Sequence, residues 1–312
     1  MGMYQFGEII KRNRENLGIT QEELSDGICS VETLSRIENG KQAPSRTMFR
    51  TLINKMGRYS EKYEPVIHSN DMDIIMDAID INTLLAQDKY EEANICLEHM
   101  KQAINLEDNV NRQYVLRMQT LVDYCLGKID SQIEREQLVE AFLCTVPSYD
   151  HQNKLLPLGV YSRCEIMIYC NIAMSYADED DLDTAIEMLY QAETYFNTTN
   201  ISVEERAVSE TLMLSNLGQC LGRQGNPEEA ITVEEKGIKI KEDGRSSNLL
   251  DHLLYNIAYE KEILKENEET CKELLLQAYF VAELNGNKHM MNHIKKHLKK
   301  MYGDLIKLTV SF

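Results

Sequence analysis

Proline is scarce in this 312-residue sequence, which contains only five, and strict alternation of polar and β-branched residues is rare. Leucine, isoleucine and methionine instead recur at intervals of three and four residues, which is the spacing of one face of an α-helix. This pattern gives little support to a strand-rich architecture. We therefore expect an all-α protein.

The sequence also lacks long apolar runs and paired cysteines. No run of 18 apolar residues predicts a membrane span, and no basic segment followed by an apolar one marks a secretory leader. The eight cysteines are never spaced as CxxC and mostly fall within helical patterns, which is typical of small buried side chains in a reducing compartment. We expect a soluble cytoplasmic protein with no membrane contact, no bound metal and no cofactor.

Basic residues are too few overall for a typical partner of a polyanion. The chain carries 33 Lys and Arg against 51 Asp and Glu, a net charge of −18. The distribution is uneven, because residues 1–65 hold 10 basic and 9 acidic side chains, whereas residues 66–312 hold 23 and 42. Only the first 65 residues, at net +1, are suited to meet phosphate groups.

Two short amphipathic segments separated by a break lie between Thr20 and Asn39, in TQEELSDGICSVETLSRIEN. Thr20 and Glu23 have the spacing of a capping box, and Ser30 is a suitable N-cap for the second segment. The spacing predicts a helix-turn-helix, whose second helix enters a DNA major groove. Helices are expected over residues 6–17, 21–27 and 31–38, with another after Pro44.

The stretch LGITQEELSDGICSVETLSRIENGKQAPS resembles the phage-repressor-type (XRE) helix-turn-helix family over roughly residues 6–67. The resemblance implies a five-helix DNA-binding domain over residues 1–68. Ile28 departs from the pattern, since the family usually has glycine there, and the second helix could end one residue early as a result. Arg14 and Glu38 occupy positions that resemble the family's internal salt bridge.

The resemblance also assigns DNA contacts on and around the helix over residues 31–38. Arg36 is suited to bind guanine O6 and N7, and a Val31 or Thr33 methyl group is suited to meet a thymine methyl. Glu32 either accepts from cytosine N4 or interacts only with the helix dipole. The predicted base-facing surface carries Ser30, Val31, Glu32, Thr33, Ser35 and Arg36. The predicted phosphate contacts are Gln21, Asn39, Lys41 and Arg46.

Beyond residue 68 the sequence repeats itself. A small residue recurs just after acidic residues at intervals of 46, 46, 45 and 41 residues. The positions are Ala93, Val139, Ala185, Ala230 and Cys271, and the copy at Val139 is degenerate. Each opens a helix that follows another helix, as in a solenoid of helical hairpins. We expect about five helix pairs over residues 69–312 and a lone helix from Lys288 to Tyr302.

The clearest copy, SNLGQCLGRQGNPEEAITVEEKGIKI at residues 215–240, resembles the tetratricopeptide repeat. The resemblance implies a right-handed solenoid with a concave surface suited to an extended peptide or a partner helix. In the first helices of three successive pairs, Asn171, Asn216 and Asn256 occupy one equivalent position. A column of amides can hydrogen-bond the backbone of an extended peptide, although such an asparagine can also bind only its own repeat.

Other residues are expected on the same inner face. Arg223 is suited to bind a peptide carboxylate, since it is a cation in an acidic domain. The remaining predicted contacts are Met167, Gln219, His252 and Tyr259. His289, His293 and His297 have the i, i+4 spacing of metal ligands, but their lysine-rich surroundings favour a solvated basic face.

The two parts together resemble the peptide-responsive regulators of Gram-positive bacteria, the RRNPP group that includes Rgg, PlcR and PrgX. The resemblance implies a homodimer that binds a palindromic operator in double-stranded DNA and responds to a short peptide. The acidic repeat domain favours an apolar or basic peptide. The alternative is a DNA-binding repressor controlled by a protein partner, such as an antitoxin-like protein. An enzyme is not expected, because no catalytic group is recognisable.

Overall fold

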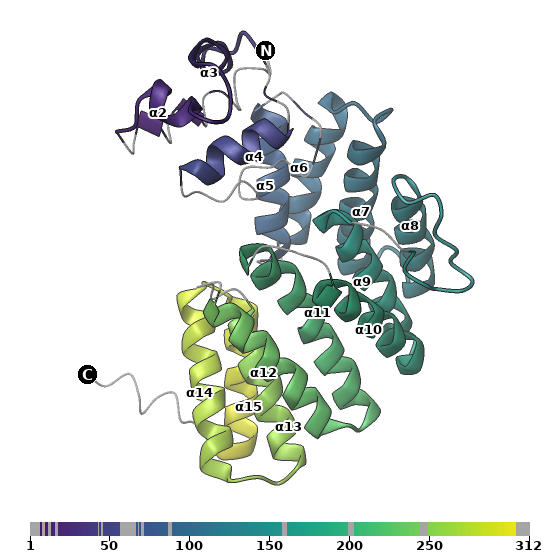
Figure 1. The fold of residues 1–312 in the computed structure, drawn as a ribbon. Coiled ribbons are helices and arrows are strands. Elements are labelled where there is room, and N and C mark those ends of the chain that lie inside the picture. The colour runs from purple at the N-terminus through teal and green to yellow at the C-terminus, as the bar shows by residue number, and fades with distance from the viewer. Residues whose placement is uncertain are drawn as a thin grey trace. The chain divides into compact units, whose positions relative to one another are not determined.

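A computed structural model gives the fold of the chain (Figure 1). It describes residues 1–312 except 1–6, 8–9, 12–13, 16–17, 43, 45, 57–66, 68, 70–71, 87–88, 158–160, 199–202, 244–248 and 304–312. The chain divides into two compact units. The first comprises Met1–Asn82 and Ile95–Arg112, and the second comprises Thr83–Asn94 and Gln113–Phe312.

The first unit contains the predicted helix-turn-helix. Its helices are α2 (Gln21–Ser25), α3 (Val31–Glu38) and α4 (Arg46–Lys55). Helix α3 has the predicted bounds, but α2 ends before the predicted Gly27, because Asp26 leaves the helical conformation and Gly27 has a φ of +75°. The expected first helix over residues 6–17 is only partly described, and residues 57–66, near the end of the expected five-helix domain, lie outside the described residues.

Helices α5 (Met72–Ala86) and α6 (Tyr90–Ala103) follow, each divided between the two units. The second unit continues as helical pairs and a final helix, and only residues 109–112 at the start of the first of these helices belong to the first unit. These are α7 (Asn109–Cys125), α8 (Ser131–Leu143), α9 (Arg163–Asp178), α10 (Leu182–Thr198), α11 (Val203–Gln224), α12 (Pro227–Asp243), α13 (Leu250–Ile263), α14 (Glu268–Leu284) and α15 (Lys288–Tyr302). The described residues contain no strand, so the all-α prediction is confirmed for them.

Successive pairs of the second unit stack on one another. Helices α9, α11 and α13, the first of each pair, are in contact in that order, and α10 and α12 each contact both the helix before and the helix after them. Ala185 and Ala230 are fully buried, and Cys271 is 1% exposed, at the start of the second helix of each pair. Small side chains there let neighbouring helices approach closely, which produces the predicted helical-hairpin solenoid.

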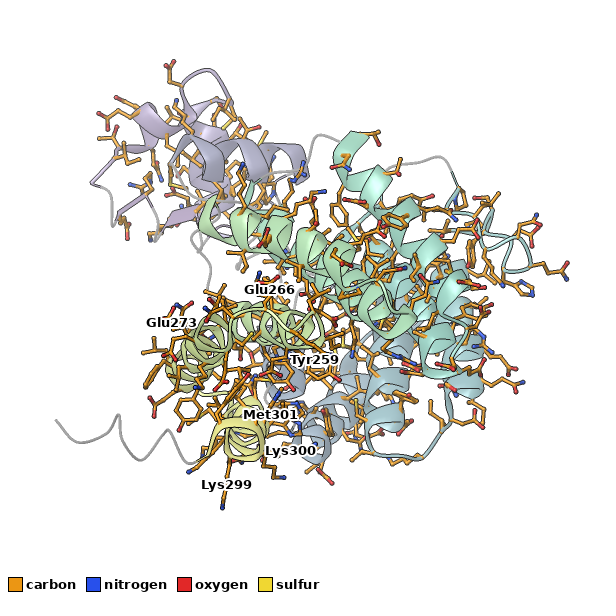
Figure 2. All side chains as sticks on the ribbon, turned by 90° about the horizontal axis from the view of Figure 1, so that it is seen from below. Tyr259, Glu266, Glu273, Lys299, Lys300 and Met301 are labelled. Atoms are coloured by element: carbon orange, nitrogen blue, oxygen red, sulfur yellow. The ribbon has the colours of Figure 1, made fainter. Side chains whose placement is uncertain are left out.

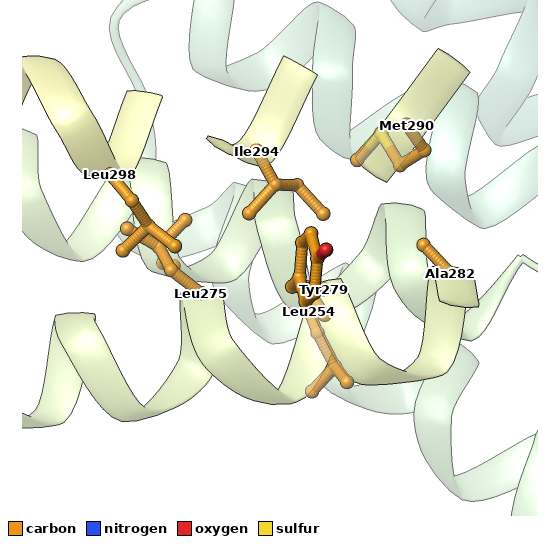
Figure 3. Packing of buried hydrophobic residues seen from close by; sticks show 9 residues of the cluster. Leu254, Leu275, Tyr279, Ala282, Met290, Ile294 and Leu298 are labelled. Atoms are coloured by element: carbon orange, nitrogen blue, oxygen red, sulfur yellow. The ribbon is translucent and has the colours of Figure 1, made fainter. Parts of the chain in front are cut away.

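The last pair and α15 share a hydrophobic core (Figure 3). Leu254 of α13 and Leu275 and Tyr279 of α14 meet Ile294 and Leu298 of α15. The buried residues of α15 recur every four positions, so this helix buries one stripe against the pair and exposes its other face. The final helix therefore caps the apolar end of the stack.

Candidate functional sites

The helix-turn-helix is held by an apolar core in the first unit. Leu24 of α2 and Leu34 and Ile37 of α3 are at most 1% exposed, and they pack with Phe49 and Leu52 of α4. Ile28 lies against the same core but is only partly buried. This packing leaves the opposite side of α3 exposed, as the predicted DNA contacts require.

Both helices of the motif are capped at their N-termini. Thr20 and Glu23 form the predicted capping box, in which the Glu23 backbone N–H donates to Thr20 Oγ1 at 3.1 Å. Ser30 Oγ accepts from the Thr33 backbone N–H at 3.1 Å and lies 2.8 Å from Thr33 Oγ1. These bonds satisfy backbone donors that the first helical turn leaves without partners. The hydroxyls of Ser30 and Thr33 are thus fixed beside each other at the start of α3.

The C-terminus of α3 ends in a Schellman motif. The backbone N–H of Gly40 donates to Ile37 O at 2.9 Å, and that of Lys41 donates to Arg36 O at 2.8 Å. Gly40 has a φ of +67°, in the left-handed region that the motif requires. Asn39 Nδ2 additionally donates to Ser35 O at 2.7 Å. The backbones of Asn39 and Lys41 therefore have fixed positions at the end of α3.

An ion pair joins the first helical segment to α3. Arg14 Nε donates to Glu38 Oε1 at 2.7 Å and Arg14 Nη2 donates to Glu38 Oε2 at 2.8 Å, which confirms the expected salt bridge. Hydrogen bonding to Glu38 raises the pKa of Arg14. Gln21 Nε2 donates to the same carboxylate at 2.6 Å. The predicted phosphate contact Gln21 is therefore also part of the domain's internal network.

The predicted base-reading side chains share one exposed side of α3. Val31 is 40% exposed, Glu32 and Arg36 are exposed, and Thr33 and Ser35 are partly buried. Among the described residues, Arg36 has no hydrogen-bond or ion-pair partner, so its guanidinium is available to a ligand. Lys41 is also exposed, whereas the side chain of Arg46 lies outside the described part of the chain.

The predicted asparagine column lies on three neighbouring helices of the second unit. Asn171, Asn216 and Asn256 are all partly buried, on α9, α11 and α13 respectively. Asn171 Oδ1 accepts from Arg117 Nε on α7 at 3.3 Å. Asn256 lies beside the carboxyl group of Glu234 on α12. Arg117 thus orients the Asn171 end of the column, and Glu234 lies beside the Asn256 end. The sequence pattern did not single out either of these two residues.

Two of the predicted peptide contacts, Arg223 and Met167, are engaged within the repeat domain itself. Arg223 Nη2 donates to Ala177 O at 2.7 Å and lies 3.4 Å from Asp180 Oδ1, so this guanidinium helps to cap the C-terminus of α9. Met167 is 5% exposed and contributes to the core of its repeat. The structure therefore gives Met167 little of the accessible surface that the predicted peptide contact requires.

The remaining predicted contacts are more accessible. Gln219 is exposed, His252 is partly buried within 3.4 Å of Asn287 Nδ2, and Tyr259 is 47% exposed. Tyr259 stacks on Tyr255 with a ring separation of 6.4 Å, and Figure 2 shows its place on α13. These side chains offer an aromatic and polar surface on the first helices of the repeats.

The histidines of α15 lie on a largely exposed face, with His289 and His293 exposed and His297 partly buried, but two of them also make side-chain contacts. His293 Nε2 lies 2.8 Å and His297 Nδ1 3.0 Å from Tyr255 Oη, and His297 Nε2 lies 2.8 Å from Glu262 Oε2. Burial lowers the pKa of His293. Lys299 and Lys300 are exposed on the same helix (Figure 2). Two of the three histidines thus fasten α15 to α13, because their spacing places them towards Tyr255.

Neither a metal-binding cluster nor a membrane-spanning helix occurs among the described residues. They contain no group of three or more histidine, cysteine, aspartate or glutamate residues placed to hold a metal ion. None of the described helices is long and apolar enough to cross a membrane.

These features define a helix-turn-helix protein with a C-terminal helical-repeat domain. Residues 10–63 match the helix-turn-helix family model, and residues 78–303 match the model of the RNPP family C-terminal domain. The chain belongs to the RNPP family. No curated protein matches the sequence.

Solved structures show the same fold over nearly the whole chain. PlcR of Bacillus thuringiensis, in complex with the peptide PapR7 and DNA, is 20% identical with a TM-score of 0.67 and covers 93% of this chain and 99% of its own. The pheromone receptor Rgg2 of Streptococcus dysgalactiae is 14% identical with a TM-score of 0.55, covering 95% and 99%. ComR of S. thermophilus, in complex with DNA and its signalling peptide ComS, is 14% identical with a TM-score of 0.53, covering 94% and 98%.

Proposed function

We propose that this protein is a transcriptional regulator that binds a specific sequence in double-stranded DNA through α3. The observation that carries this proposal is the exposed side of α3, where Arg36 has no partner among the described residues while the opposite side is buried in the domain core. Capping at both ends and the Arg14–Glu38 ion pair fix that helix before DNA arrives. A rigid helix with exposed hydrogen-bonding side chains is suited to read base edges in the major groove.

The proposed DNA contacts fall into two groups. Ser30, Val31, Glu32, Thr33, Ser35 and Arg36 form the base-facing group, and Gln21, Asn39, Lys41 and Arg46 form the phosphate group. Base contacts determine which sequence is bound, whereas phosphate contacts determine position and orientation. The acting form is a cytoplasmic homodimer on a palindromic operator, since two copies of one domain read two equivalent half-sites.

The ligand of the repeat domain is a short peptide. Support comes from the asparagine column and from the PlcR and ComR structures, which hold a peptide together with DNA. The proposed contacts are Asn171, Asn216 and Asn256, with Gln219, Arg223, His252 and Tyr259 around them. A peptide changes the DNA affinity only through different affinities for two states of the protein.

The test is a binding measurement on the full chain. Operator fragments are first selected from genomic DNA. The affinity of the protein for these fragments is then measured with and without synthetic peptides whose sequences are encoded near the gene of this protein. A change in DNA affinity on adding one peptide supports the proposal. A stoichiometric protein partner together with no peptide effect would favour control by protein binding instead.

A further inference from the structure

Arg117 on α7 has an unusual environment for an arginine. Its Nε donates to Asn171 Oδ1 at 3.3 Å, and its guanidinium lies beside the Cys164 side chain. The side chain is partly buried. A guanidinium carries five N–H donors, so these two neighbours leave several donors without a protein acceptor. Because the side chain is partly buried, water can satisfy those donors only in part.

Neighbouring arginines of the second unit are paired with acids. Arg135 lies 2.8 Å from Glu179, and Arg206 lies 2.6 Å from Glu210. No carboxylate of the described residues lies within ion-pair distance of Arg117, although residues 66–312 contain 42 acidic side chains against 23 basic ones. An unpaired, partly buried cation in so acidic a chain points to an anion that is not part of the chain.

The surroundings of Arg117 are suited to strengthen such an interaction. The Cys164 and Cys170 side chains beside it are buried, and burial raises the pKa of both thiols while Arg117 opposes that shift. An anion brought here is therefore partly shielded from water, which strengthens its attraction to the guanidinium. Because a guanidinium only donates, it faces Asn171 Oδ1 and leaves Asn171 Nδ2 to donate elsewhere.

We propose that Arg117 and Asn171 together bind a carboxylate group of the peptide ligand. The planar guanidinium supplies paired donors to the carboxylate, and Asn171 Nδ2 supplies a further donor beside them. This inference rests on the proposed peptide-binding function. It assigns the carboxylate to Arg117 rather than to Arg223, because Arg223 already donates to Ala177 O and lies near Asp180.

The experiment uses the full-length chain and a synthetic pool of random heptapeptides, prepared once as free acids and once as C-terminal amides. Peptides captured by the wild-type protein are identified by mass spectrometry, and their affinities are measured individually. Peptides in which asparagine replaces aspartate, or glutamine replaces glutamate, distinguish a side-chain carboxylate from the C-terminal one. The variants are Arg117→Gln and Arg117→Lys, with Arg135→Gln as the matched control, and thermal melting checks that each is folded.

Removal of the responsible peptide carboxylate is expected to weaken binding to the wild-type protein about tenfold or more. Arg117→Gln should bind the acid and amide forms equally, at the wild-type affinity for the amide, while Arg117→Lys retains part of the preference. Arg135→Gln should keep the full preference. Equal weakening of acid and amide forms by Arg117→Gln overturns the inference and leaves peptide binding intact. Capture of no peptide by the wild-type protein overturns both the inference and the proposed peptide function.

Discussion

Glu38, the last residue of the recognition helix α3, accepts two hydrogen bonds from Arg14, at 2.7 and 2.8 Å. The Glu38 side chain is 1% exposed and the Arg14 side chain is 12% exposed, so the pair is largely shielded from water. Arg14 Nη1 also donates to Ile19 O at 2.9 Å, which ties the loop before α2 to the same point. The position of α3 within its domain therefore depends on this pair.

Replacement of Arg14 by alanine is expected to destabilise the DNA-binding domain by about 3 kcal/mol, because it leaves the buried Glu38 carboxylate without its charged partner. Chemical denaturation of the full chain measures the loss of stability. Unfolding of the first unit is monitored by its susceptibility to a protease. Glu15→Ala is the control, since Glu15 is 53% exposed and 3.6 Å from Arg14. Equal stability of the two variants would show that the pair contributes little.

Arg36 and Lys41 are expected to act differently on DNA. Arg36→Ala should weaken binding to the selected operator by about 1–3 kcal/mol and relax specificity at one base pair. Lys41→Ala should weaken binding to all DNA sequences by a similar factor. It should also reduce the slope of the logarithm of the binding constant against the logarithm of the salt concentration by about one. Fluorescence anisotropy at several salt concentrations, on operator and scrambled DNA, measures both effects. If the two variants behave alike, the division into base-reading and phosphate contacts is wrong.

The close approach of Gly222 to Glu260 predicts the effect of one added methyl group. A Cβ at position 222 of α11 would lie 2.1 Å from Glu260 Oε1, and the Glu260 residue is only 6% exposed. Gly222→Ala should therefore destabilise the repeat domain by about 1–3 kcal/mol despite the higher helix propensity of alanine. Thermal unfolding of the full chain measures this.

Two further variants test that explanation. Gly237→Ala is the matched control, because its Cβ would approach its nearest neighbour, Leu253, only to 3.3 Å. Gly222→Ala combined with Glu260→Ala should recover part of the lost stability, since the clash is removed. If the double variant recovers no stability, contact with Glu260 is not the cause of the destabilisation by Gly222→Ala.

Glu234 makes stability depend on pH. Burial raises the pKa of this fully buried carboxyl to about 8, with a smaller opposing effect of Asn256. The folded chain therefore binds more protons at this group than the unfolded chain from about pH 4.3 to pH 8. The contribution of Glu234 to stability is present below that interval and is lost as the pH rises through it.

Glu234→Gln should consequently remove part of the stability loss that the wild-type chain shows as the pH rises from 5 to 8. Urea unfolding at a series of pH values, compared with the exposed neighbour variant Glu235→Gln, isolates the contribution. A Glu234→Gln profile parallel to the wild-type profile would mean that the carboxyl titrates normally in the folded protein.

Asn216 is the central member of the asparagine column. Asn216→Ala should leave the affinity for operator DNA unchanged and reduce the response to the peptide, because one pair of backbone hydrogen bonds to the ligand is lost. DNA affinity is measured with increasing peptide concentration for the variant and the wild-type protein. An unchanged response would remove Asn216 from the peptide site.

Sequence reasoning could predict much of this fold because its signals are local. Capping residues such as Thr20 and Ser30, and small residues such as Ala185 and Ala230, act within one or two helices, so their spacing predicts where helices begin and how they pair. The observed bounds of α3 and α15 are those predicted. The end of α2 was predicted too late, because the conformation of Asp26 depends on the turn that follows.

The side-chain environments were less predictable, because they depend on residues distant in sequence. Arg117 and Asn171 are 54 positions apart, and Arg223 and Ala177 are 46 apart. The helical period places Arg223 on an inner helix, but it cannot show that the end of α9 already occupies its guanidinium. Tyr255, likewise, is 38 positions from His293, so the contact that fastens α15 to α13 was not predicted.

The most direct test of DNA reading by α3 is selection of genomic fragments by the purified full-length protein, followed by sequencing, with Arg36→Ala in parallel. We expect the wild-type protein to enrich a palindromic motif whose half-sites lie about one helical turn apart, and the variant to lose the preference at one position of each half-site. Enrichment of no motif by the wild-type protein, with and without peptide, would contradict the proposal.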